Sequence, residues 1–243
     1  MVFGLFSKEK ALQRTIEKAT NKLAQQADRW AALEKLKDDS SEDALVGMCR
    51  RFAITSLKGV EDEAEKLWVV DTLVTKGPPA LPALVRYMKK ADQLAFPLKV
   101  LERIAARDKV LEVVDQLLAS EPPGYVRMPE RRIDLLRWFA EWKPATDDEL
   151  ISRATPYVTD FDENVRFAAI DGMATREPAR IAPPLIAALV RPDEESGRIK
   201  RAITEVLEKT KAPLGDQADA VAAALTGPLA DAFKVEGGTI KKR

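Results

Sequence analysis

The sequence predicts an all-α protein, arranged as a right-handed α-solenoid of about five helix pairs behind a long N-terminal capping helix. Apolar residues recur at spacings of three and four along nearly all of the 243 residues, whereas the alternation typical of strands is almost absent. Proline and glycine interrupt this pattern at 77–79, 122–124, 143–144 and 211–213, which leaves helices of about 12 to 16 residues. Similar segments also return at a nearly fixed interval.

The interval is clearest around two prolines. When Pro82 is aligned with Pro183, the apolar positions of ALPALVRYM (80–88) match those of APPLIAAL (182–189). Corresponding helix positions recur along the chain at an interval of about 33 residues, which indicates a solenoid whose helix pairs pack on their neighbours. The corresponding positions are Leu67, Leu98, Ile133, Val165 and Ile199.

Residues 1–37 are predicted to be an amphipathic segment and capping helix ahead of a repeat array at 38–211. From Ser7 onward the apolar spacing, with Leu23 and Trp30 in its stripe, predicts one long helix that covers the first repeat. Ahead of this helix, large apolar side chains precede a run of basic ones, which suits docking on a partner groove or weak peripheral contact with an anionic membrane. The docking residues are Val2, Phe3, Leu5 and Phe6.

Residues 41–57 predict a helix that begins at Ser40 or Ser41. Its buried face carries Leu45, Met48, Cys49 and Phe52 at helical spacing. The chain has no histidine that could activate the single cysteine, so Cys49 is interpreted as a small core residue. At the other end, residues 212–234 are predicted to be capping helices and residues 235–243 a basic flexible tail.

The segment DFDENVRFAAID (160–171) allows two interpretations. Its acidic and amide side chains occupy the first, third, fifth and twelfth places of a calcium loop. That loop needs glycine at the sixth place and a bidentate glutamate at the twelfth, where this chain has Val165 and Asp171. The segment is therefore interpreted as a helix start with Asp160 and Asp162 at its N-terminus, and Thr146 to Glu149 as a capping box at another.

DENVRFAAIDGM (162–173) resembles the second helix of a HEAT repeat of the short kind found in bilin-lyase-like proteins. RIAPPLIAALVRPDEESGRIKRAITEVL (180–207) is similar to the unit that follows, with Pro183 inside its first helix. The resemblance covers about 144–210 well and 78–107 fairly, and elsewhere it rests on spacing. It implies that Asp162 and Arg166 belong to a ladder of hydrogen bonds between stacked units. The units near 67 and 133 depart from the pattern, because they lack its Val-Arg pair.

The charge distribution argues against nucleic acid as a partner. The chain carries 39 basic and 39 acidic side chains. Residues 1–37 hold eight basic and four acidic side chains, and residues 234–243 hold four basic and one acidic. The body of the chain, residues 38–233, therefore holds 27 basic and 34 acidic side chains, a net charge of −7. A body of this charge repels a phosphate backbone over most of its surface.

No sequence pattern indicates catalysis. Histidine is absent, and no glycine-rich nucleotide loop, nucleophile elbow or zinc-binding HExxH motif occurs. The sequence thus predicts no enzyme, cofactor or metal. Without a long apolar segment or a signal-peptide core, it predicts a cytoplasmic protein.

The expected function is that of a scaffold or adaptor that binds a polypeptide on the concave face formed by the second helices. Tryptophan and arginine are the residue types most enriched in binding hot spots. The alternative for 129–144 is that Trp138 packs between helices and that Arg137 pairs with Glu141. The candidate partner-binding residues are Trp68, Arg103, Arg137, Trp138, Glu141 and Arg201.

Two other functions stay open. HEAT-like alkylpurine DNA glycosylases use a carboxylate and aromatic side chains on a concave surface, and a comparable set occurs here, although the net charge of −7 opposes DNA binding. A peripheral membrane adaptor anchored by the N-terminus is the second alternative. The residues of the glycosylase hypothesis are Asp134, Trp138, Arg131, Arg132 and Arg137.

Overall fold

The structure is a computed structural model, which describes residues 2–243, with side chains described from Lys8 onward. Within these residues the chain forms fourteen α-helices, four short 3-10 helices and one two-stranded sheet. The predicted all-α class is therefore confirmed apart from this small sheet. The chain divides into two compact units, Met1–Ser120 (unit 1) and Glu121–Arg243 (unit 2), and this division falls inside the range expected to form one array.

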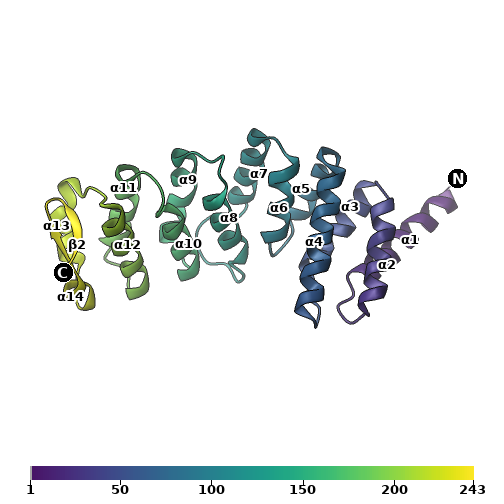
Figure 1. Cartoon of the computed structure of the whole chain (residues 1–243), viewed down its shortest axis with the longest axis horizontal. Helices are drawn as coiled ribbons and strands as arrows, with labels where there is room; N and C mark the ends of the chain where they lie inside the picture. The colour runs from purple at the N-terminus through teal and green to yellow at the C-terminus, as the bar shows by residue number, and fades with distance from the viewer. Residues whose placement is uncertain (1) are drawn as a thin grey trace. The chain divides into compact units, whose positions relative to one another are not determined.

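Unit 1 consists of paired helices (Figure 1). Helices α1, α3 and α5 pack one after another, as do α2, α4 and α6, and the members of each pair also contact each other. The buried face of α3 carries Leu45, Met48 and Cys49, and Ser41 accepts a hydrogen bond at its start, as predicted. The elements are α1 (Val2–Ala19), α2 (Gln26–Asp38), α3 (Glu42–Cys49), η1 (Arg50–Ala53), α4 (Gly59–Lys76), η2 (Pro78–Ala80), α5 (Leu81–Met88), α6 (Ala95–Ile104) and α7 (Arg107–Ala119).

Unit 2 follows a similar plan. Helices α8, α10 and α12 pack in sequence, and α9, α11 and α13 do so beside them. The predicted capping box is present at the start of α9, where Thr146 and Glu149 each bond the other's backbone amide. The elements are α8 (Glu130–Glu141), α9 (Asp147–Ala154), η3 (Thr155–Thr159), α10 (Glu163–Met173), α11 (Pro178–Leu189), α12 (Gly197–Thr210), η4 (Gly215–Gln217), α13 (Ala218–Ala224), α14 (Pro228–Ala232), β1 (Phe233–Glu236) and β2 (Thr239–Lys242).

The predicted single N-terminal helix is wrong. The chain forms two helices, α1 and α2, which pack against each other across a turn at residues 20–25. The turn forms because the Asn21 side chain accepts a hydrogen bond from the amide of Leu23, which favours a turn over continued helix. Leu23, expected in the apolar stripe, is consequently 76% exposed. The backbone at residues 2–7 belongs to α1, but the side chains of the predicted docking residues lie outside the described part of the structure.

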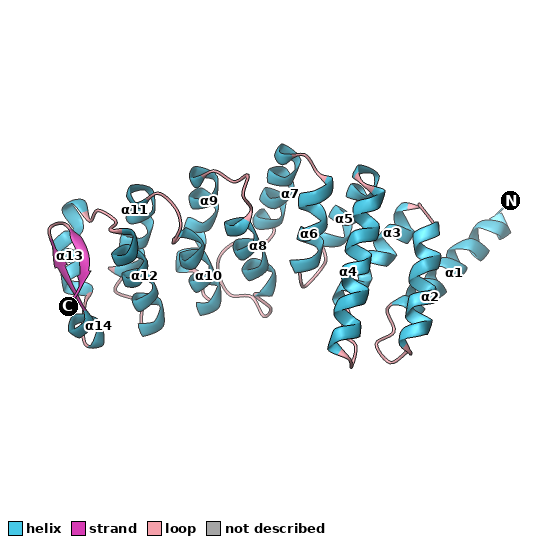
Figure 2. Cartoon of the chain, in the orientation of Figure 1, coloured by secondary structure: helices cyan, strands magenta, loops and turns pink. Residues whose placement is uncertain are grey.

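The predicted flexible tail is also wrong. Residues 233–242 form an antiparallel hairpin in which Phe233 pairs with Lys242 and Val235 with Ile240 (Figure 2). Gly237 and Gly238 both adopt positive φ, which a tight hairpin turn requires. The side chains of Phe233 and Ile240 are buried, so the hairpin is packed structure. Residues 212–232, expected as capping helices, contain the short helices α13 and α14.

The aligned repeat positions are only partly core positions. Leu98, Val165 and Ile199 are fully buried, whereas Ile133 is half-buried and Leu67 is 41% exposed. The prediction for Leu67 is wrong because the buried face of α4 carries Glu65, Lys66 and Val69, and Leu67 points away from this face. No helix in residues 2–243 is apolar over a length that would span a bilayer.

Candidate functional site

Trp68 lies where α2 and α4 meet. Its ring centroid is 5.4 Å from that of Trp30 on α2, and the ammonium of Lys37 lies 5.7 Å from the Trp68 ring centroid. The Trp68 side chain is half-buried. Arg103 on α6 is close by in the fold, because its guanidinium lies 3.3 Å from the carboxylate of Asp71 on α4. Of the six predicted partner-binding residues, these two therefore converge on one helix, α4.

A hollow of about 710 Å³ borders Trp68 near the ends of α2 and α4. Its lining combines one aromatic ring, hydroxyl groups and charges of both signs, with two acidic and two basic side chains. This mixture suits a ligand with both polar and apolar parts. The lining residues are Lys37, Asp38, Ser40, Leu45, Trp68, Asp71, Thr72, Thr75, Lys76 and Pro79.

A smaller hollow of about 380 Å³ lies at the opposite ends of the same two helices. Two loops form its rim, the α1–α2 turn and the segment that precedes α4. Leu57 on the second loop is 91% exposed, and Leu23 on the first is also largely exposed. The lining residues are Lys22, Leu23, Ala24, Gln25, Gln26, Ala27, Arg29, Ser56, Leu57, Lys58 and Glu61.

The two hollows lie along one edge of each helix. On α4, Glu61 borders the smaller hollow and Trp68, seven residues later, borders the larger one, so both side chains leave the helix on the same side. On α2, Gln26 and Lys37 hold the corresponding places, with Trp30 between them. We call the two hollows, together with the Trp30–Trp68 pair on the helices between them, the α2–α4 groove. Gln26 and Lys37 are eleven residues apart on α2, which at about 1.5 Å each is about 16 Å along the helix.

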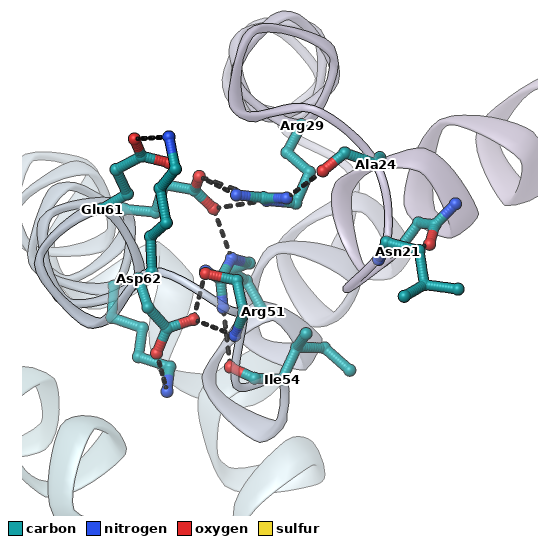
Figure 3. Close-up of polar contacts among 12 residues, drawn as sticks. Asn21, Ala24, Arg29, Arg51, Ile54, Glu61 and Asp62 are labelled. Atoms are coloured by element: carbon teal, nitrogen blue, oxygen red, sulfur yellow. Dashed lines mark hydrogen bonds and ion pairs between the residues drawn. The ribbon is translucent and has the colours of Figure 1, made fainter.

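A buried network of charged side chains holds the groove together (Figure 3). Arg29 on α2 donates to Glu65 on α4, with 2.9 Å between Nη2 and Oε1. Arg51 on η1 lies 2.7 Å from Glu65 and 2.7 Å from Asp62, and Lys66 lies 2.8 Å from the other oxygen of Asp62. All five side chains are buried. Three cations and two carboxylates thus fix the distance between α2, η1 and α4.

The network keeps the Asp62 carboxylate ionised. Burial raises the pKa of Asp62, but hydrogen bonds from Lys66, from the Ser56 amide and from Arg51 outweigh it and lower the pKa to about 2. The hydrogen bond to Glu65 raises the pKa of Arg29 above its ordinary value. No pattern in the sequence pointed to this network, because its members are spaced irregularly and come from three elements.

The predicted residues of unit 2 do not converge in this way. Arg137 and Glu141 are exposed on α8 and form no ion pair with each other in the described structure, so the pairing expected as the alternative is wrong. Trp138 is half-buried, and its ring stacks on Trp142 at the end of the same helix with 5.7 Å between centroids, so its packing between helices stays a prediction. Arg201 on α12 pairs with Glu205 one turn later.

Two of the three cations of the glycosylase hypothesis have carboxylate partners, and the third, Arg137, is exposed. Arg131 and Arg132 are both buried. The guanidinium of Arg131 lies 2.8 Å from Glu121, and that of Arg132 lies 3.0 Å from Asp160 and donates to two backbone carbonyls. These two side chains therefore face the protein interior, where a phosphate backbone would not reach them.

Repeated ion pairs link neighbouring helices of unit 2. Arg132 on α8 pairs with Asp160 ahead of α10, and Arg166 on α10 pairs at 3.0 Å with Glu194 ahead of α12. Each arginine precedes its partner by 28 residues, and the second pair follows the first by one helix pair. Asp162 caps α10 by accepting from the amides at 164 and 165. Arg166 therefore takes part in a recurring ion pair, whereas Asp162 bonds the start of its own helix, and the ladder that the resemblance implies for these two residues stays a prediction.

The start of α10 confirms the helical interpretation of 160–171. Asp162 is the N-cap and Asp160 accepts from Arg132, so both carboxylates serve the protein's own donors. In the described part of the chain, no cluster of three or more histidine, cysteine or acidic side chains has a metal-binding arrangement. Cys49 is fully buried, and burial raises the pKa of its thiol to about 12, which agrees with its predicted place in the core.

Comparisons with protein-family models, with curated proteins and with solved structures give no significant match to the chain.

Proposed function

We propose that the chain is a non-enzymatic polypeptide-binding module, and that its α2–α4 groove holds the partner. The observation that supports this proposal is the Trp30–Trp68 pair between two hollows on one helix edge. Partly exposed aromatic side chains offer a large contact area at a small entropic cost, and tryptophan is prominent among binding hot spots. The groove is about 16 Å long, which matches about five residues of an extended peptide at about 3.3 Å each.

The charges around the groove favour a polypeptide over nucleic acid. Lys37 and Lys76 border the larger hollow together with Asp38 and Asp71, so the field there is mixed. A polypeptide meets such a surface with its own amides and side chains of both signs, whereas a phosphate backbone needs a continuous positive strip.

We further propose that the helix pairs of each unit are HEAT-like repeats that stack as an α-solenoid. Supporting this are the consecutive packing of α8, α10 and α12 and the ion pairs that recur from one helix pair to the next. The interval of this recurrence lies within the range of helical repeat families. In this proposal α2 and α4 are second helices, and the groove lies on the face that such repeats use for partners.

Capture of partners from native extract tests the binding proposal. The full chain and a Trp68→Ala variant are compared, and Trp138→Ala in unit 2 is the matched control. We expect Trp68→Ala to lose the captured polypeptide by at least about tenfold, because a hot-spot tryptophan contributes more than about 2 kcal/mol. Trp138→Ala should retain the polypeptide. Thermal melts of all three proteins show whether each variant is folded.

The opposite outcome would place the binding site in unit 2. Loss of the partner in Trp138→Ala but not in Trp68→Ala would place binding on α8 and contradict the groove proposal. A DNA-binding assay at moderate salt completes the test, since salt-sensitive binding that depends on Arg137 would favour the glycosylase-type alternative.

A further inference from the structure

The smaller hollow of the α2–α4 groove collects hydrogen-bond donors. Helix α2 begins there, its N-cap Gln25 gives no side-chain cap, and the amides of Gln26 and Ala27 have no acceptor in the described structure. Such amides and the positive end of the helix dipole favour an anion. Lys22 and Lys58 add two ammonium groups to the lining. The Lys58 ammonium lies 3.0 Å from the carboxylate of Glu61.

Ser56 supplies a second and independent sign of a ligand. Ser56 is one of the residues that line the hollow, it is only 7% exposed, and its hydroxyl has no hydrogen-bond partner among the described residues. The Ser56 amide already donates to Asp62 at 2.8 Å, so the backbone is held and the hydroxyl alone is unsatisfied. A buried hydroxyl without a partner is costly, and a bound acceptor would remove this cost.

The walls of the hollow are aliphatic. Leu23, Ala24, Ala27 and Leu57 line it beside the donors. The acidic side chain of the first turn of α2, Asp28, borders a different hollow shared with α1. A ligand that fits here therefore carries an anionic group and an apolar group within a few ångströms of each other.

The number of free cations distinguishes a carboxylate from a phosphate. A phosphorylated side chain carries nearly two negative charges and is usually bound by an arginine cluster. The arginines below this hollow, Arg29 and Arg51, are already bound to Glu65 and Asp62. Lys22 is the lining cation that has no carboxylate partner in the described residues, which suits a single negative charge.

We propose that this hollow receives the C-terminal carboxylate of the bound polypeptide. The carboxylate accepts from the amides of Gln26 and Ala27 and from the Ser56 hydroxyl, and the aliphatic side chain of the last residue packs against Leu23 and Leu57. The preceding residues extend along the groove toward Trp68. This inference rests on the proposed function, because it names which part of a polypeptide the groove binds.

Peptides with and without a terminal charge test the inference. A library of heptapeptides, random at six positions and ending in leucine, is screened against the full chain as free acids and as C-terminal amides. Fluorescence anisotropy of the selected peptides should give dissociation constants at least about tenfold lower for the acid than for the amide. Ser56→Ala should weaken binding of the acid by roughly tenfold and leave that of the amide unchanged. Lys22→Ala should weaken the acid several-fold.

Matched variants control for general effects. Ser152→Ala and Lys89→Ala remove an exposed hydroxyl and an exposed ammonium elsewhere in the chain, and both should bind the acid like the parent protein. Thermal melts of Ser56→Ala confirm folding, since the substitution removes only the unpartnered hydroxyl.

Different outcomes separate this inference from the proposed function. Equal affinity for acid and amide, with both lost in Trp68→Ala, overturns the carboxylate site and leaves the groove proposal standing. Selective binding of the acid that Trp68→Ala does not change supports the carboxylate site and overturns the groove proposal. A preference for internally phosphorylated peptides, or no binding of any heptapeptide, overturns the inference.

Discussion

The two units bury their charges in different ways. In unit 1, Glu65 lies between Arg29 and Arg51, so one carboxylate joins three structural elements. In unit 2, Arg132 and Arg166 each have their own acidic partner ahead of the next helix of the layer, and the arrangement recurs from one helix pair to the next. The first arrangement concentrates the electrostatic energy in one place, whereas the second distributes it along the unit.

This difference explains where the candidate site lies. A repeated pair, from each helix to the segment ahead of the next helix of its layer, links adjacent helices in the same way each time. The shared network of unit 1 instead includes the short helix η1 and leaves the hollow bordered by Ser56 beside it. The unit whose ion pairs do not follow the repeated pattern is therefore the one that carries the proposed binding surface.

The largest effect is expected at the centre of the unit 1 network. Glu65→Ala would leave Arg29 and Arg51 buried without their shared carboxylate, which costs about 3–5 kcal/mol of unfolding free energy. Denaturant melts followed by circular dichroism measure it. The control is Glu63→Ala on the exposed side of α4, which should change stability by less than about 0.5 kcal/mol. A similar small loss for both variants would show that the network does not hold unit 1 together.

Core packing in unit 2 should give the next largest effect. Replacing Leu185 or Val165 with alanine removes a fully buried side chain and should cost about 2–4 kcal/mol. Leu67→Ala in unit 1 is the informative comparison. Because this leucine is partly exposed, its replacement should lower the free energy of unfolding by less than about 0.5 kcal/mol. If Leu67→Ala destabilised the protein as much as Leu185→Ala, Leu67 would belong to the packed core after all.

A single ion pair of unit 2 should matter less than the shared carboxylate of unit 1. Glu194→Ala removes one partner of Arg166, which still donates to the carbonyls of Asp160 and Phe161. We expect a loss of about 1–3 kcal/mol in the same melts. A double-mutant cycle with Arg166→Ala isolates the coupling energy of the pair. A coupling energy near zero would show that the ion pair between Arg166 and Glu194 does not stabilise unit 2.

Acid should weaken the unit 1 network through Asp62. Its pKa is about 2 in the folded protein and about 3.9 in an unfolded chain, so the stabilisation is complete above about pH 4 and is lost as the pH falls toward about 2. The expected loss is about 2 kcal/mol. Melting curves between about pH 2 and pH 5 measure it, and Asp62→Asn should flatten the profile in that window. An unchanged profile in that variant would mean that other carboxylates dominate acid unfolding.

The smallest expected effect concerns calcium. Because Asp162 caps α10 and Asp160 binds Arg132, added Ca²⁺ should leave the melting temperature unchanged. A calcium-dependent rise that disappears in Asp162→Ala would restore the calcium-loop interpretation of 160–171.

Features that depend on local pattern were predictable. The buried face of α3, the capping box at Thr146 and the start of α10 all follow from residues within one or two helical turns. A buried stripe is visible in sequence because every fourth or third side chain shares a face. The same reasoning placed Cys49 in the core.

Features that depend on helix rotation or on distant partners were not predictable. The charged residues of α4 are of the types that usually face solvent, yet Glu65 and Lys66 are buried because Arg51 and Asp62 neutralise them. Of the candidate site, Trp68 was found by residue type, whereas Trp30 was assigned to the buried stripe of one long helix, which the structure divides into α1 and α2. The hairpin did leave a signal, since Gly237-Gly238 separates two short alternating runs, but the basic residues around it favoured a tail.

The hairpin of unit 2 also bears on how the proposed solenoid could change its length. It packs against α12, where that solenoid would place the next helix of the layer, and Lys241 and Lys242 on its second strand are exposed. Lysines beside an open strand edge discourage pairing with another strand. In the proposed solenoid, a helix pair placed beyond the hairpin would thus find neither an apolar helix face nor a compatible edge. Under that proposal a further pair would pack ahead of residue 212, with the hairpin kept at the outer side of the last helix.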